Sequence, residues 1–62
     1  MDDISKMIDV LYAFKLGMYV IYKDDYGTWW SVRDTHIFDF HHQYRIIETS
    51  DIDNYLDELN RK

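Results

Sequence analysis

Cysteine and proline are both missing from this chain of 62 residues, and glycine occurs only twice. Without cysteine the fold has neither disulfides nor thiolate metal sites, an absence that fits a reducing compartment. The only glycines, Gly17 and Gly27, are expected in turns, so the chain lacks the glycine-rich loop that holds phosphate groups. No repeat, low-complexity segment or linker divides the chain, so residues 1–62 are expected to form a single domain.

Long apolar runs and an excess of positive charge are missing as well. No apolar segment approaches the length of a membrane span, and the acidic start at Asp2 and Asp3 is unlike the basic head of a signal peptide. The chain carries 12 acidic and 7 basic side chains, a net charge of -5, whereas nonspecific binding to nucleic acid requires a basic surface. We therefore expect a cytoplasmic protein that directly contacts neither a membrane nor nucleic acid.

Aromatic residues, in contrast, are abundant: the chain has six Tyr, three Phe and two Trp. Each aromatic side chain buries a large apolar area, but a chain of this size buries only about 60% of the surface that its unfolded form exposes. The surplus of rings over what one small core needs indicates a second apolar surface. A homodimer or higher homo-oligomer would cover this surface and stabilise a domain that has no disulfide.

Apolar residues at helical spacing predict a helix at each end of the chain. The first helix, from about Asp3 to Leu16, has acids at its start that suit the helix dipole and Gly17 in the place of a left-handed C-cap. Its apolar stripe consists of Ile4, Met7, Ile8, Leu11 and Phe14. The second helix spans about 51–60, with Ser50 as its N-cap. Its stripe consists of Ile52, Tyr55, Leu56 and Leu59.

The segment between the helices is rich in β-branched and aromatic residues, which favour strands. Residues 18–22 and 28–33 predict a hairpin, in whose loop Gly27 takes a positive φ. A third strand is predicted over 37–40, and residues 44–48 form either a fourth strand or a continuation of the third. The predicted class is α+β: an N-terminal helix, a three- or four-stranded antiparallel β-meander and a C-terminal helix, with both helices on one face of the sheet.

Alternation along the predicted strands gives two apolar faces. One face carries Val20, Tyr22, Trp30, Val32, Phe38 and Phe40. The other carries Tyr19, Ile21, Trp29, Arg33, Ile37, Arg45 and Ile47. A solvated face of an antiparallel sheet is normally polar, and neither of these is. The pattern does not decide which face is covered, because a shift of one residue exchanges the two.

The stretch from Leu11 to Ile47 resembles a class of small phage-encoded accessory proteins. The shared pattern is a helix ending at Leu16-Gly17, the strand 18–22, an acidic turn, Gly27-Thr28-Trp29-Trp30, and Phe38-Asp39-Phe40 leading to Tyr44-Arg45-Ile46. It covers well over half of the chain, and its motifs are short and structural. The resemblance implies a phage or prophage origin, action in the host cytoplasm, and an early anti-defence or host-takeover role such as the inhibition of a bacterial protein.

The helix-glycine-strand opening is also similar to that of oligomeric phage sponges, which sequester nucleotide second messengers. Those proteins place a basic, glycine-rich turn after the strand, where this chain has Asp24-Asp25-Tyr26-Gly27. In this alternative, Trp29 or Tyr22 would stack on the base, and Arg33 or Arg45 would bind the phosphates.

The residues give little support to catalysis or metal binding. Zinc needs three or four converging ligands, and adjacent residues of a strand point to opposite faces. The only cluster of metal-ligand types is His36, Asp39, His41 and His42. The carboxylates occupy helix starts, a hairpin turn and an outer helix side, and no serine lies in a nucleophile motif. We expect no enzymatic activity, no cofactor and no metal.

The expected function is stoichiometric binding that inhibits or modulates a bacterial host or defence protein, for example one with a basic nucleic-acid-binding surface. Trp, Tyr and Arg are enriched in binding hot spots, and carboxylates steer a protein onto a basic partner, although the same acids would also keep a small apolar protein soluble. The predicted contact residues are Tyr19, Tyr26, Trp29, Arg33, Arg45, Asp53, Asp57 and Glu58.

Two alternatives to this assignment stay open. An antitoxin-like accessory protein would show the same features, and a register shifted by one residue would place Trp29 and Tyr19 in the core. If Trp29 is instead exposed, replacing Trp29 and Arg33 by alanine should abolish association and leave the fold intact.

Overall fold

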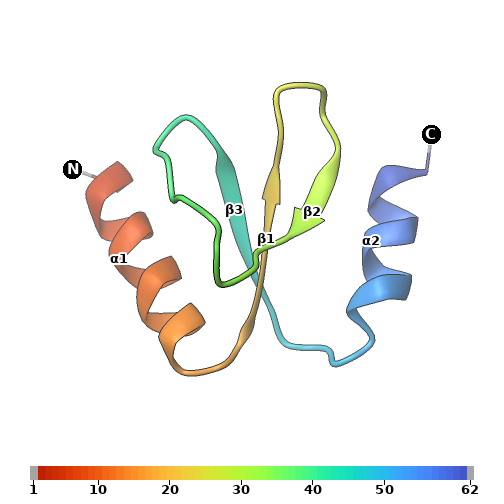
Figure 1. The fold of residues 1–62 in the computed structure, drawn as a ribbon, viewed down its shortest axis with the longest axis horizontal. Helices are drawn as coiled ribbons and strands as arrows, with labels where there is room; N and C mark the ends of the chain where they lie inside the picture. The colour runs from red at the N-terminus through yellow and green to blue at the C-terminus, as the bar shows by residue number, and fades with distance from the viewer. Residues whose placement is uncertain (1, 62) are drawn as a thin grey trace.

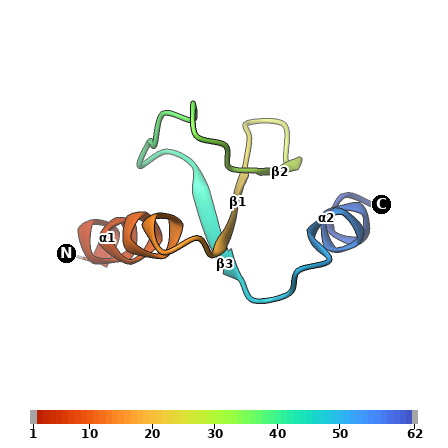
Figure 2. The same ribbon diagram turned by 60° about the horizontal axis from the view of Figure 1, so that its bottom comes forward.

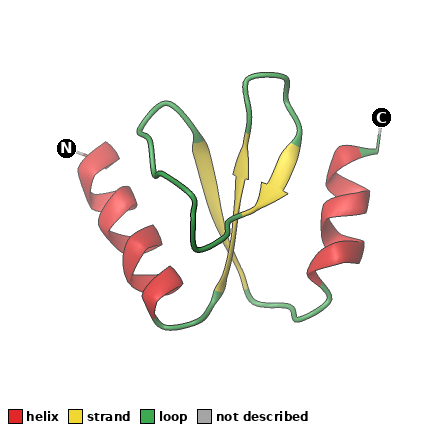
Figure 3. Cartoon of the chain, viewed as in Figure 1, coloured by secondary structure: helices red, strands yellow, loops and turns green. Residues whose placement is uncertain are grey.

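The computed structural model describes residues 2–61 as two helices and three strands. In chain order these are α1 (Asp2–Lys15), β1 (Tyr19–Lys23), β2 (Trp29–Ser31), β3 (Gln43–Ile47) and α2 (Ile52–Asn60) (Figures 1 and 3). The α+β class, with a helix at each end of the chain and antiparallel strands between them, is confirmed. Neither helix in the described part of the chain is long and apolar enough to cross a membrane.

The strand order corrects the predicted meander. β1 is central and pairs antiparallel with β2 on one side and with β3 on the other, so that Tyr22 lies between Trp30 and Tyr44. In a meander, β3 would instead have paired with β2, its neighbour in the chain. Residues 37–40, the predicted third strand, belong to the connection that crosses from β2 to β3, and the third strand comes from the 44–48 segment. Within residues 2–61 the sheet has three strands.

The two helices cover opposite faces of the sheet, which corrects the prediction that they share one face (Figures 1 and 2). On one face, Val20 of β1 packs with Val10 and Ala13 of α1. On the other face, Ile21 packs with Trp29 and Ile47 beneath α2. The predicted division of β1 and β2 into two faces was therefore right, but each face has its own helix. The sheet thus has two thin cores rather than one, and Tyr19, Trp30 and Ile46 of its strands are exposed.

Each glycine supplies the backbone conformation expected of it. Gly17 has a φ of 89° and ends α1 in a Schellman motif, because the Met18 N–H donates to the Ala13 carbonyl at 3.0 Å and the Gly17 N–H to the Phe14 carbonyl at 3.1 Å. Gly27 has a φ of 86° in the β1–β2 loop. A residue with a Cβ is strained at such angles. The start of α2 differs from the prediction, since Asp51 rather than Ser50 is its N-cap.

The apolar stripe predicted for α1 is mostly outside the core, to which it contributes only Phe14. The buried residues of the helix are Val10 and Ala13, with Phe14 packed against them. Ile4, Ile8 and Leu11, which formed most of the predicted stripe, are exposed. The helix has apolar residues around more than half of its circumference, so the sequence periodicity alone did not determine which flank would face the sheet.

Candidate functional site

Trp29 is buried, which corrects its prediction as a surface contact. Only 6% of the residue is exposed, because it lies on the sheet face that α2 covers. The guanidinium of Arg45 lies 4.7 Å from the centre of the Trp29 ring, and the Lys23 ammonium lies 5.9 Å from it. These are cation–π distances. Two of the predicted contact residues, Trp29 and Arg45, are thus brought together, but as a structural pair in which only Arg45 is exposed.

The remaining predicted contacts on the strands and loops are exposed and scattered. Tyr19 lies at the start of β1, and Arg33 follows β2. Tyr26 is 91% exposed at the tip of the β1–β2 loop. The loop itself is fixed by Asp24, whose carboxylate accepts hydrogen bonds from Trp30 Nε1 at 2.7 Å and from the Thr28 N–H at 2.9 Å. These bonds, led by that of Trp30, lower the pKa of Asp24.

An open groove lies between the end of β3 and α2. Its volume is about 480 Å³, and it is shallow and open to solvent. Apolar groups come from Ile46, Ile47 and Tyr55, and the carboxylates from Glu48, Asp51 and Glu58. Thr49 and Asn54 complete the lining. All three acids are exposed, whereas Ile47 is buried and Tyr55 is half-buried. The groove therefore combines an apolar floor with an acidic rim.

Of the three acids of α2 that were predicted as contact residues, only one lies at the groove. Glu58 lines the groove, and Asp53 and Asp57 do not. In an α-helix, positions five residues apart differ by about 140° in direction, so Asp53 and Glu58 lie on different flanks of α2. Asp57 instead forms an ion pair with Arg61, with Oδ2 and Nη2 3.1 Å apart. Glu48, Asp51 and Tyr55 were missed by the sequence prediction because their proximity depends on how α2 packs against the sheet.

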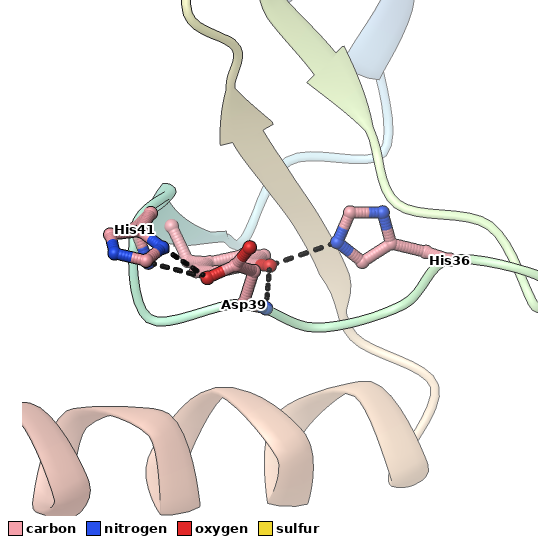
Figure 4. Close-up of polar contacts among 4 residues, drawn as sticks. His36, Asp39 and His41 are labelled. Carbon is pink, nitrogen blue, oxygen red and sulfur yellow. Dashed lines mark hydrogen bonds and ion pairs between the residues drawn. The ribbon is translucent and has the colours of Figure 1, made fainter.

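A second cluster of polar and aromatic side chains joins the β2–β3 connection to Tyr22 of β1 and Tyr44 of β3 on the α1 face. Figure 4 shows the polar contacts of His36, Asp39 and His41 in this connection. The Tyr44 hydroxyl lies 2.9 Å from His36 Nε2 and accepts a hydrogen bond from the Asp39 N–H at 3.0 Å. The Tyr22 ring lies 4.5 Å from the His36 ring and 5.2 Å from the His42 ring, centre to centre. These contacts hold the connection against the sheet. They explain why residues 37–40, although alternating like a strand, are not paired as one.

The same contacts make the fold sensitive to acid. Burial lowers the pKa of His36 below its ordinary value of 6.5, and repulsion from His42 lowers it further. As the pH falls, His36 therefore binds a proton in the unfolded chain at a higher pH than in the folded protein. The contribution of His36 to stability is present above pH 6.5 and is lost as the pH falls through the folded pKa. The Tyr44 hydroxyl can donate to His36 Nε2 only while that nitrogen is unprotonated.

We expect the melting temperature to fall as the pH is lowered from 7 to about 5, and the fall to be shallower in His36→Phe, which keeps a ring beside Tyr22 but cannot titrate. Circular dichroism melts across this range measure the slope. His41→Phe is the matched control, because the His41 side chain is 91% exposed and bonds only to Asp39. An equal slope in the wild type and His36→Phe would contradict the assignment.

Comparison with known proteins finds no match: no family model, no curated protein and no solved structure is significantly similar to this chain.

Proposed function

We propose that this protein binds, one to one, a basic segment of another protein in the groove between β3 and α2. The observation that carries the proposal is the acidic rim, formed by Glu48, Asp51 and Glu58, over an apolar floor. An acidic rim alone would be ordinary solubilising charge. Here the carboxylates border apolar surface from the exposed Ile46 and the half-buried Tyr55, so one bound segment can contact both kinds of group.

Lysine and arginine side chains fit such a groove because their stems are apolar and their heads are charged. The stems would cover Ile46 and Tyr55, and the heads would reach the carboxylates at the rim. The net charge of -5 would also speed encounter with a basic partner at low salt. A neutral or acidic segment would gain only the apolar contact.

The class of function we propose is inhibition or modulation of a bacterial host or defence protein by occupation of its basic surface. The resemblance to small phage accessory proteins supports this class of target. The nucleotide-sponge alternative is less well supported, because it needs Trp29 or Tyr22 to stack on a nucleotide base. Trp29 is buried beneath α2, and Tyr22 is packed among His36, His42 and Tyr44.

Reversing two charges at the rim should weaken binding at least about tenfold, or ~1.4 kcal/mol. The variant is Glu48→Lys with Glu58→Lys. Its matched control is Asp53→Lys with Asp57→Lys, which changes the net charge by the same amount on the other flank of α2. Binding is measured by fluorescence anisotropy with a labelled peptide of alternating lysine and leucine, and by affinity capture from bacterial lysate with the same three proteins as bait.

The wild type and the control should bind the peptide and capture the same lysate protein, and the rim variant should do neither. Equal loss in both variants would show that net charge alone attracts the ligand and would contradict a groove. Equal binding of an alternating glutamate and leucine peptide would contradict the basic preference. Binding should also weaken as salt is raised, since exposed charges are screened.

A further inference from the structure

The outward side of α1 is an apolar surface that neither core uses. Five large side chains, four in the helix and one on the residue that directly follows it, are between 43% and 64% exposed: Ile4, Ile8, Leu11, Tyr12 and Leu16. The contribution of the helix to the core is mainly the smaller Val10 and Ala13, with Phe14 beside them. We define this surface as the α1 ridge.

Four of the five residues form one continuous row. Ile4, Ile8, Tyr12 and Leu16 are spaced four apart, so each is displaced by about 40° from the one before, and the row is about 18 Å long. Rows of this spacing are the ridges that fit into the grooves of a second helix in the commonest class of helix packing. Leu11 lies beside the centre of the row. The ridge thus has the shape of a helix-packing surface, with its closest contact near the middle of α1, because helices packed in this way cross at about 50°.

We propose that the α1 ridge binds the α1 ridge of a second copy of this chain, with the two helices antiparallel. A two-fold axis near the middle of the helix would place Ile4 beside the partner's Leu16 and Ile8 beside the partner's Tyr12. Every large residue of the row then meets an apolar residue of similar size. Such self-complementarity is what a two-fold interface requires.

The helix dipoles of α1 favour the antiparallel order. Antiparallel packing opposes the two dipoles, whereas parallel packing would align them. Ion pairing with Lys15 of a second copy adds little to this preference. Asp3 is five residues from Ile8 and therefore points about 140° away from it, where it lines a hollow with Phe40. The order of the two helices thus rests on their dipoles.

The size of the ridge suits a small dimer interface. Five half-exposed side chains of on the order of 100 Å² each give about 500 Å² per protomer, and a stable interface buries about 800 Å² per partner, with polar side chains at its rim supplying the rest. An apolar patch of this size is at the upper end for a monomer. A membrane surface is a poorer occupant, because a chain with a net charge of -5 is repelled by anionic lipids.

The first test is the oligomeric state, measured by sedimentation velocity from about 1 to 300 µM, a range that reports micromolar dissociation constants. The wild type should dimerise, and Ile8→Asp at the centre of the ridge should weaken the dimer at least about 100-fold. The matched control is Ile37→Asp, an identical change at a residue that is 85% exposed in the β2–β3 connection. It should dimerise like the wild type. Circular dichroism confirms that both variants are folded.

The second test reads the helix order directly. Because the chain has no cysteine, single-cysteine variants can be joined only at chosen positions. Ile4→Cys mixed with Leu16→Cys should be joined by a short bismaleimide. Ile4→Cys alone should not, since its two copies would lie about 18 Å apart in an antiparallel pair. Efficient joining of Ile4→Cys alone would overturn the antiparallel order.

A wild type that stays monomeric over the whole range, or a dimer that Ile8→Asp does not weaken, would overturn the proposal. If the monomer instead binds neutral or anionic vesicles, or a captured lysate protein, through Ile8, the ridge belongs to that partner and self-association is rejected. The ridge and the groove are separate surfaces, so the two proposals fail independently. Glu48→Lys with Glu58→Lys should dimerise normally, and Ile8→Asp should still bind the lysine and leucine peptide.

Discussion

Replacing Trp29 by alanine is expected to unfold the protein or bring it close to unfolding. The ring packs with Ile21 and Ile47 against α2, and Arg45 lies over it. Truncation of a buried tryptophan costs about 3–5 kcal/mol, and a single core in a domain of this size rarely supplies more than about 3–5 kcal/mol in total. The loss is therefore comparable to the whole stability. The structure thus reverses the prediction that Trp29 can be removed without harm to the fold.

Urea denaturation followed by circular dichroism measures the effect, and the adjacent tryptophan is its matched control. Trp30 is half-exposed, and its main polar contact is the hydrogen bond from Nε1 to Asp24. Trp30→Ala should therefore cost only about 1 kcal/mol. A cooperative unfolding transition for Trp29→Ala at the same urea concentration as for Trp30→Ala would contradict the burial of Trp29 beneath α2.

The contrast between the two tryptophans shows what local pattern could and could not predict. Alternation correctly assigned Trp29 and Trp30 to opposite faces, with Ile21 beside Trp29 and Tyr22 beside Trp30. The assumption of one covered face was wrong. With two helices and only three strands, each helix takes its own face. Six of the eleven aromatic residues pack in or against the two cores, and the other five are exposed. The sheet therefore gives a weaker argument for a partner than the count of rings suggested.

The order of the strands could not be read from local sequence because pairing is non-local. Residues 37–40 alternate like a strand, but the contacts of His36 and Asp39 with the Tyr44 hydroxyl hold this segment in a connection. β1 then pairs with β3, and the paired residues are 20 to 28 positions apart in the chain. The same limit applies to the groove, whose acids come from the end of β3 and from α2. Glu58 was predicted as a contact residue, and its neighbours across the groove were not.

The orientation of α1 was uncertain for a different physical reason. Its apolar residues occupy two flanks, and either flank could have packed on the sheet. The structure buries the flank with Val10 and Ala13, whose small side chains allow the helix to approach closely, and leaves the larger Ile4 and Ile8 outside. The apolar surface that favours self-association is therefore on α1 rather than on the sheet.

Replacing Asn60 by alanine is expected to cost about 2 kcal/mol, because each buried polar group left unpaired costs about 1–3 kcal/mol. The Asn60 side chain bridges the last turn of α2 to the backbone of β2. Its Oδ1 accepts a hydrogen bond from the Trp29 N–H at 2.7 Å, and its Nδ2 donates to the Trp29 carbonyl at 3.0 Å. β2 is an edge strand, so these Trp29 groups point away from β1 and are satisfied by α2 alone.

The bridge should also protect the edge of the sheet, since an unpaired edge strand is a template for aggregation. Asn60→Ala is therefore expected to lower the urea midpoint and to increase light scattering at high concentration. The matched control is Asn54→Ala, which removes only an exposed 3.3 Å bond to Asp51 and should change stability by less than about 0.5 kcal/mol. Equal midpoints for the two variants would show that the Asn60 bridge is not formed in solution. A lowered urea midpoint without increased light scattering would support the stabilising role of Asn60 and contradict its role in protecting the edge strand.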